Sequence, residues 1–170
     1  MRVRKPRPPE DPDSSKAAYF RALRWLTARE LSEAQVRTRL AQRGYSQSAI
    51  DPAIERLIGD RTIDDRRAAV AVARTEARVR RHGPRRVMGR LIEMKIDRDV
   101  AADVVRELFG EHDEAELLEA ALERRLRGKP GRLADPRERR KLVAFLVRQG
   151  YSAGAAAAAL RRKSKPSAAR

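Results

Sequence analysis

Cysteine is absent from this 170-residue chain, which excludes disulfide bonds and thiolate chemistry and fits a reducing compartment. Aromatic residues make up only 4% of the chain. A short segment can therefore bury little apolar surface alone and must share a core with its neighbours. β-Branched residues are sparse, whereas Ala, Leu, Arg and Glu, which are good helix formers, are abundant. This composition predicts an all-α protein.

Long apolar runs are also missing. The most apolar run, Ala153–Leu160, is far shorter than the roughly 20 residues that a membrane-spanning helix needs. Residues 1–15 (MRVRKPRPPEDPDSS) lack the apolar core of a signal peptide. We therefore expect a soluble, cytoplasmic protein without membrane contact. Residues 1–15 are polar and Pro-rich, which predicts a disordered arm, and residues 161–170 form a basic tail.

Charge is unevenly distributed along the chain, whose net charge is +16. Residues 66–95 hold ten Arg or Lys against two Glu, whereas residues 96–123 hold two Arg against ten Asp or Glu. Residues 124–170 hold fifteen Arg or Lys against two acidic residues. Two basic blocks flanking an acidic one favour a polyanionic partner. The alternative is a solvated Arg-rich surface without a specific ligand.

A short sequence motif occurs twice in the chain. Residues 39–46 read RLAQRGYS, and residues 145–152 read FLVRQGYS. A third copy lies between them, where Lys95–Ile96–Asp97 replaces Gly–Tyr–Ser. Three columns of apolar residues then align: Leu40 with Leu91 and Leu146, Val36 with Val87 and Leu142, and Ile54 with Val105 and Leu160. The pattern predicts three copies of one structural unit.

Helix start and stop signals divide each copy into three helices. Ser32 and Gln35 have the spacing of a capping box, and Gly44 is a natural helix end. The next helix begins either after Ser46 or at Asp51, with Pro52 at its first position. Further on, we expect a helix from Asp64 or Asp65 to about Arg81 and another opening at Pro84. Asp135, Pro136 and Glu138 predict a cap, a first-turn proline and a second capping box.

The units expected from these signals cover residues 16–63, 64–112 and 113–160. Each has three helices and is too small to bury its apolar faces alone. Tandem stacking would share core between neighbours and produce an elongated, curved helical-repeat rod.

Several stretches resemble the RecX family, bacterial regulators of the RecA recombinase: RELSEAQVRTRLAQRGYS, RTIDDRRAA, HGPRRVMGRLIEMKID and RKLVAFLVRQGYS. The resemblance covers residues 16–162. Its most specific parts are Asp64–Asp65–x–Arg67 and the run that opens with Gly83–Pro84. The chain departs from the family pattern at Ala68, where Phe is usual, and by lacking a Gly between Lys95 and Ile96.

The resemblance implies a regulator that lies in the groove of the RecA–single-stranded DNA filament and mainly inhibits recombinase and ATPase activity. It places the protein in recombination, DNA repair and the SOS response. It also implies that the protein has no catalysis of its own. We expect a monomer, since a repeat rod needs no dimer, and weak, sequence-independent contact with single-stranded DNA.

The residue types of a catalytic or metal site are present but badly spaced. Asp64 and Asp65 are adjacent, so on a helix their side chains point about 100° apart and do not converge on one ion. At a helix start they fit a capping role instead. His82 and His112 lack Cys or a second His at ligand spacing, and no phosphate-binding or dinucleotide motif occurs. We expect no enzyme activity, no cofactor and no metal.

Basic residues on the second helix of each unit are the candidate filament- and DNA-binding set, because the arginine fork matches phosphate oxygens. The set comprises Arg37, Arg39, Arg43, Arg85, Arg86, Arg90, Arg139, Arg140, Lys141 and Arg148. Tyr45 and Tyr151 could stack on bases, but their position before a cap favours a hydrophobic staple. A free-standing nucleic-acid-binding protein or transcription regulator with helix-turn-helix-like units stays open as an alternative, as does a scaffold repeat.

Overall fold

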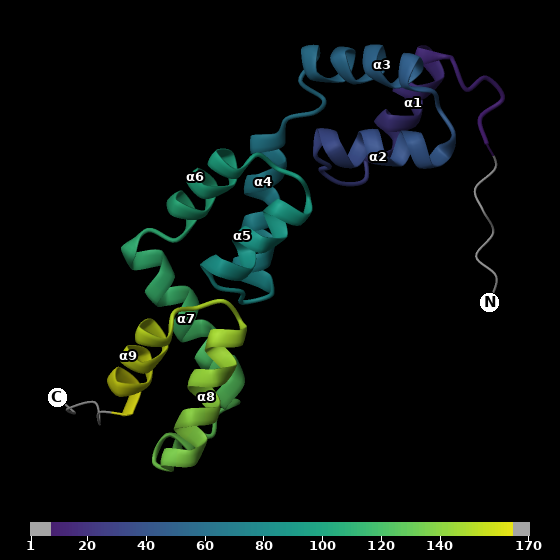
Figure 1. Cartoon of the computed structure of the whole chain (residues 1–170). Coiled ribbons are helices and arrows are strands. Elements are labelled where there is room, and N and C mark those ends of the chain that lie inside the picture. The colour runs from purple at the N-terminus through teal and green to yellow at the C-terminus, as the bar shows by residue number, and fades with distance from the viewer. Residues whose placement is uncertain (1–7, 165–170) are drawn as a thin grey trace, which may run out of the picture. The chain divides into compact units, whose positions relative to one another are not determined.

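The computed structural model describes residues 8–164, except for the side chains of 111–113 and 130. Regular structure in this part is helical throughout, without a strand, which confirms the all-α prediction (Figure 1). The elements are α1 (Ser15–Leu26), α2 (Glu33–Arg43), α3 (Gln47–Gly59), α4 (Asp65–Arg74), a π-helical turn (Thr75–Val79), α5 (Pro84–Glu93), α6 (Arg98–Leu108), α7 (Glu111–Leu126), a 3-10 turn (Pro130–Leu133), α8 (Pro136–Arg148) and α9 (Ala153–Ser164).

The chain folds as two compact units. Among the described residues, the first comprises 8–71 and 93–97, and the second comprises 72–92 and 98–164. The boundary between them falls within α4, so the helices expected for the middle repeat are divided between the two compact units.

In the first compact unit, α1 packs against α3 and α2 (Figure 1). Its core is built from the apolar columns of these helices, including Val36, Leu40 and Ile54, each fully buried. Ser14 caps α1 by accepting a hydrogen bond from the Ala17 amide at 3.2 Å. The N-terminal arm makes a defined contact here, since the Ser46 amide donates to the Pro12 carbonyl at 3.0 Å. Residues 1–7 of that arm lie outside the described part of the chain.

The α3 helix begins at Gln47 and carries Pro52 in its interior, so the alternative start at Asp51 is wrong. Ser46 occupies the cap position without forming a side-chain cap bond. The missing Pro52 amide would have bonded the Ser48 carbonyl, and both residues are exposed. The apolar face of α3, with Ile50 and Ile54 buried, is what holds the helix through the proline.

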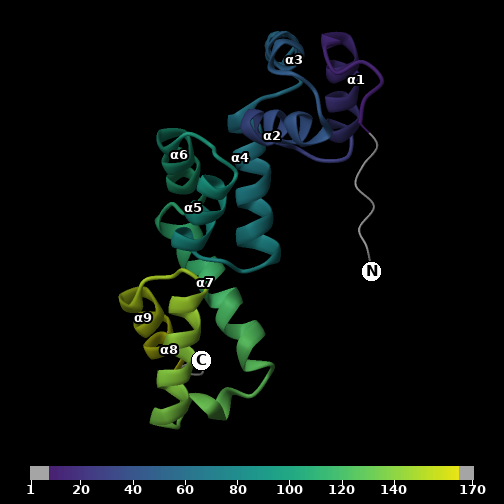
Figure 2. The ribbon, with the colours of Figure 1, turned by 45° about the vertical axis from the view of Figure 1, so that its right-hand side comes forward.

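In the second compact unit, α7, α8 and α9 pack together, as both ribbon views show (Figures 1 and 2). Leu142, Leu146 and Leu160 belong to their shared core. Asp135 caps α8 by accepting from the Arg137 amide at 2.8 Å, with Pro136 at the first position, as predicted. The second capping box is wrong, because Glu138 turns to Arg132 and Lys141 instead.

The predicted repeat is visible in the backbone of its three copies. Gly44 and Gly150 have φ angles of 100° and 101°, and the following tyrosine amides donate to Leu40 and Leu146, each at 3.2 Å. Lys95, the counterpart in the middle copy, also has a left-handed backbone, with φ of 58°. One helix-ending turn therefore recurs three times, as expected of a helical-repeat fold.

Candidate functional site

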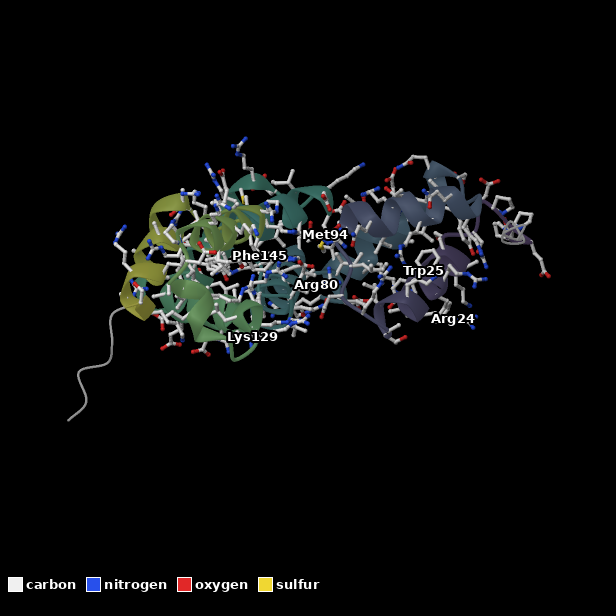
Figure 3. The ribbon with its side chains drawn as sticks, turned by 90° about the horizontal axis from the view of Figure 1, so that it is seen from below. Arg24, Trp25, Arg80, Met94, Lys129 and Phe145 are labelled. Carbon is white, nitrogen blue, oxygen red and sulfur yellow. The ribbon has the colours of Figure 1, made fainter. Side chains whose placement is uncertain are left out.

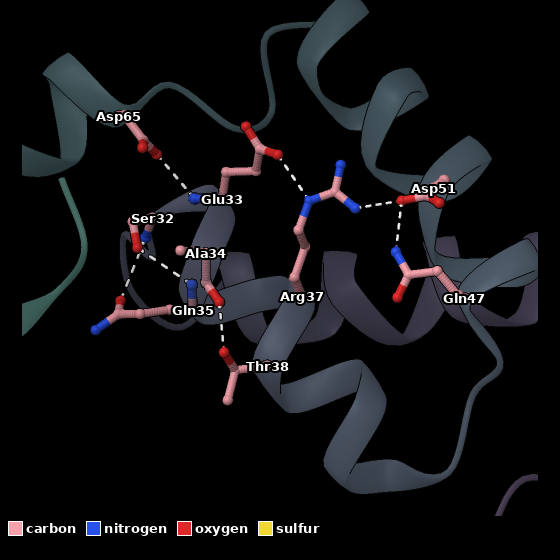
Figure 4. Close-up of polar contacts among 9 residues, drawn as sticks. All are labelled: Ser32, Glu33, Ala34, Gln35, Arg37, Thr38, Gln47, Asp51 and Asp65. Carbon is pink, nitrogen blue, oxygen red and sulfur yellow. Dashed lines mark hydrogen bonds and ion pairs between the residues drawn. The ribbon is translucent and has the colours of Figure 1, made fainter. Parts of the chain in front are cut away.

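The Asp64–Asp65–x–Arg67 motif links the starts of two helices, α4 and α2, in the first compact unit. Asp64 caps α4, since its Oδ1 accepts from the Arg67 amide at 2.8 Å. Asp65 turns the other way and accepts from the Glu33 amide at the start of α2, also at 2.8 Å (Figure 4). Burial raises the pKa of Asp65, an effect that this hydrogen bond partly offsets. The two carboxylates serve two different helix starts and do not converge on one ion.

The Arg67 side chain adds further hydrogen bonds to this link. Its Nε donates to Glu30 Oε1 at 2.8 Å, and its terminal nitrogens donate to the carbonyls of Arg61 and Thr62 at 3.0 and 2.9 Å. The segment after α3 is thereby tied to α4 and to the residues that precede α2. One guanidinium therefore serves three acceptors, a number that the five donors of arginine allow.

Ser32 connects the same region to the end of α5. Its Oγ accepts from the Gln35 amide at 3.2 Å, which together with the reciprocal Gln35 bond forms the predicted capping box. The hydroxyl also donates to the Met94 carbonyl at 2.6 Å, and Ser32 is fully buried. One side chain therefore satisfies polar groups from two distant segments.

The arginines of α2 do not form the expected open surface. Arg37 lies between Glu33, at 2.7 Å, and Asp51, and it lowers the pKa of that aspartate (Figure 4). Arg39 is half-buried over the ring of Trp25, with 5.9 Å between the guanidinium carbon and the ring centroid. Arg43 lies beside Pro8–Asp11, where it lines a shallow hollow. Sequence reasoning missed these intramolecular partners.

The Gly83–Pro84 motif docks backbone against backbone onto the turn after α8, within the second compact unit. The Gly83 amide donates to the Gln149 carbonyl at 2.8 Å, and the Arg85 amide donates to the Gly150 carbonyl at 3.2 Å. Carbonyls after the end of α8 thus satisfy amides at the start of α5, an arrangement that also aligns the two helix dipoles. Pro84 is the first residue of α5 and has no backbone N–H, so no donor lacks a partner at that position.

This docking brings three of the predicted basic residues to one place. Arg86 Nη1 donates to the Arg148 carbonyl at 3.4 Å, and Arg85 precedes it on the first turn of α5. All three side chains are exposed. Those of Arg85 and Arg148 form no ion pair with the residues that the structure describes. Arg90, further along α5, is exposed as well.

The remaining predicted residues lie on the first turns of α8. Lys141 pairs with Glu138 at 2.8 Å, and Lys141 and Arg132 together lower the pKa of Glu138 to about 2. Arg139 and Arg140 line an apolar groove of about 530 Å³ between α8 and α9. The structure therefore separates this group from the Arg85–Arg86–Arg148 group, which lies at the other end of α8.

A further basic hollow was not predicted. It lies in the second compact unit and has a volume of about 490 Å³. Its basic lining residues are Arg80, Arg81, His82, Arg124, Arg125 and Arg127. The signal was present as two short like-charge runs, but the runs are more than forty residues apart in the sequence and only the folded chain unites them.

Tyr45 and Tyr151 are both buried, Tyr151 completely, so neither ring is open to stack on a base. Among the side chains that the structure describes, no group of three or more His, Cys, Asp or Glu could hold a metal ion. In the described part of the chain, no helix is long and apolar enough to cross a membrane.

These features define a helical-repeat protein assembled from three-helix domains. Residues 18–57 match the family model described as "RecX, first three-helix domain", and residues 112–160 match "RecX, third three-helix domain". The chain is 32% identical over 136 residues to "Regulatory protein RecX" of Syntrophotalea carbinolica, covering 79% of this chain and 88% of that one. It is 33% identical over 136 residues to its namesake in Trichlorobacter lovleyi, covering 78% and 86%. The chain belongs to the RecX family.

A solved structure supports the same fold. The crystal structure of RecX from Lactobacillus salivarius aligns with a TM-score of 0.76, covering 89% of this chain and 97% of that one. Its sequence is 20% identical, so this similarity concerns the fold alone.

Proposed function

We propose that this chain is a non-enzymatic regulator that binds the RecA–single-stranded DNA filament and mainly inhibits its ATP hydrolysis and strand exchange. The observation that carries the proposal is the identity of 32–33% over most of the chain to proteins named Regulatory protein RecX. Recombination, DNA repair and the SOS response are the cellular setting that follows.

The structure supports a binding role through its surface. Arg85, Arg86 and Arg148 present exposed guanidinium groups on helix ends that are docked backbone to backbone. A rigid support of this kind lowers the entropy lost when the side chains bind. A planar guanidinium binds phosphate or carboxylate oxygens in pairs, so the group suits a partner made of both DNA and acidic protein surface.

We infer that three-helix units at residues 16–63, 64–112 and 113–160 follow one another along the filament. A monomer that contacts neighbouring protomers would hinder the addition of the next one, which accounts for inhibition without catalysis. Contact with DNA is then to the backbone, and it is weak and independent of sequence.

The test is the DNA-dependent ATPase activity of the cognate recombinase on single-stranded DNA, with this protein at substoichiometric amounts. We expect hydrolysis and strand exchange to fall at moderate salt. Full activity in the presence of the folded protein would refute the proposal. A tight, sequence-selective duplex site with little salt dependence would instead favour a transcription regulator.

A further inference from the structure

The basic hollow of the second compact unit is built from two segments. One is the end of the π-helical turn and the residues up to His82, and the other is the end of α7. Ala121 of α7, Phe145 of α8 and Gln149, just after α8, complete the lining; Arg80 and Phe145 are labelled in Figure 3. A volume of about 490 Å³ is within the range of pockets that hold small ligands.

Two contacts hold the walls of this hollow in place. Arg124 Nη1 donates to the Val79 carbonyl at 3.2 Å, which ties the two segments together. The Arg125 guanidinium lies 5.0 Å from the centroid of the Phe145 ring. Arg81 and Arg127 each follow a helix end with a left-handed backbone, at φ angles of 64° and 49°, and both line the hollow.

Positive charge in this hollow is poorly compensated. Glu76 is the acidic partner, paired with Arg80 at 2.9 Å and with His82 Nδ1 at 2.6 Å, and it is buried below them. Arg81 and Arg127 form no side-chain hydrogen bond or ion pair with the described residues. Like charges repel at close range, so an anion bound among these arginines would relieve that repulsion.

The chemistry of the lining indicates which anion fits. Guanidinium groups bind phosphate oxygens bidentately, whereas an exposed apolar side chain can pack against the face of a base. Val79, a lining residue, is 66% exposed, and it stands beside the arginines. We propose that this hollow binds the phosphodiester backbone of single-stranded nucleic acid, with a base lying on the Val79 side. The inference rests on the proposed function and assigns its DNA contact to this pocket.

The experiment measures fluorescence anisotropy of a labelled oligothymidylate with the full chain at low salt. Arg81→Gln/Arg127→Gln should weaken binding roughly tenfold or more, since charged hydrogen bonds are lost. The slope of log affinity against log salt should fall by about 1.4, for two phosphates on a single strand. The matched control is Arg24→Gln/Arg29→Gln, which removes the same charge from exposed positions of the first compact unit.

Equal losses in both double variants, or none in the pocket variant, would overturn the assignment. Should the Gln variant not fold, Arg81→Lys/Arg127→Lys keeps the charge and should weaken affinity while leaving the salt slope unchanged. Inorganic triphosphate that displaces the oligonucleotide at equimolar amounts would also overturn it, in favour of a free phosphate ligand. The ATPase assay with the unmodified chain judges the proposed function separately, because it does not depend on which residues bind DNA.

Discussion

Gly83 and Gly150 lie backbone against backbone, so that neither has room for a side chain. A Cβ on Gly83 would lie 2.7 Å from the Gly150 carbonyl carbon, and a Cβ on Gly150 would lie 2.6 Å from the Arg86 amide nitrogen. The glycine of the Gly83–Pro84 motif and the glycine of the last repeat turn are therefore two halves of one contact.

Alanine at either glycine should destabilise the fold. We expect Gly83→Ala to lower the free energy of unfolding by about 1–3 kcal/mol, because backbone must move apart. Gly150→Ala should cost about 2–4 kcal/mol, since its φ of 101° adds strain. Urea denaturation measures both. Gly89→Ala is the control on the same helix as the motif: its Cβ would meet nothing within 4 Å, so it should stabilise by about 0.5–1 kcal/mol. A neutral Gly83→Ala would contradict the tight docking.

Lys95 occupies the left-handed turn position that glycine occupies in the other two repeats. Lys95→Gly should raise the free energy of unfolding by about 0.5–1 kcal/mol, because relief of the strained backbone exceeds the added flexibility of the unfolded chain. Lys95→Ala keeps the strain and should change stability by less than about 0.5 kcal/mol. Chemical denaturation of the three proteins compares them directly, and a destabilised Lys95→Gly would refute the left-handed geometry.

Ser32 should be the most costly serine to lose. Ser32→Ala removes the cap of α2 and leaves the Met94 carbonyl without its donor, so we expect a loss of about 2–3 kcal/mol in thermal or urea unfolding. Ser46→Ala serves as the control, since Ser46 forms no side-chain cap bond. It should cost less than about 0.5 kcal/mol. Similar losses for both would argue against the buried Ser32–Met94 contact.

The buried hydroxyl of Tyr151 should lower the stability of the fold at alkaline pH. Burial, and then the charge of Glu114, raise the pKa of Tyr151 to about 12 from 10.0. Because the folded pKa lies above the unfolded one, its stabilisation is complete below pH 10 and is lost as pH rises through 12. Tyr151→Phe should match the parent near neutral pH, since the Tyr151 hydroxyl reaches the Arg81 carbonyl only at 3.5 Å. At about pH 11 the variant should be the more stable of the two in urea. Parallel pH profiles would contradict the buried hydroxyl.

A charge reversal at Arg85 and Arg86 tests whether these residues bind the filament. Arg85→Glu/Arg86→Glu should weaken inhibition of the recombinase ATPase roughly tenfold or more, because attraction to phosphate becomes repulsion. Helicity should survive, since acidic residues are favourable in a first helical turn. Arg24→Glu/Arg29→Glu makes the same charge change elsewhere and should leave inhibition nearly intact. Unchanged inhibition by the Arg85/Arg86 variant would remove these residues from the binding surface.

Local signals predicted local structure well. The Ser32–Gln35 capping box, the Gly44 helix end and the Asp135–Pro136 cap all occur where short-range hydrogen-bonding rules place them. Two of the aligned columns are buried throughout, and Leu40, Leu91 and Leu146 are each fully buried. In the third column Val105 is only partly buried, because α6 turns Ala101 and Val104 inward instead. The second capping box failed because Glu138 has stronger, cationic partners in Arg132 and Lys141. A neighbour six residues away across a turn is beyond the reach of a capping rule.

Amino-acid order alone determined the helical class, the triplicated unit and its glycine-ended turns, because helix propensity and caps act over a few residues. Which arginines are available was decided only by tertiary structure. Arg37 is engaged by Asp51, fourteen residues further on, whereas Arg81 and Arg127 meet around one hollow from distant segments. Electrostatic partners are set by proximity in space, and that proximity exists only once the helices have packed.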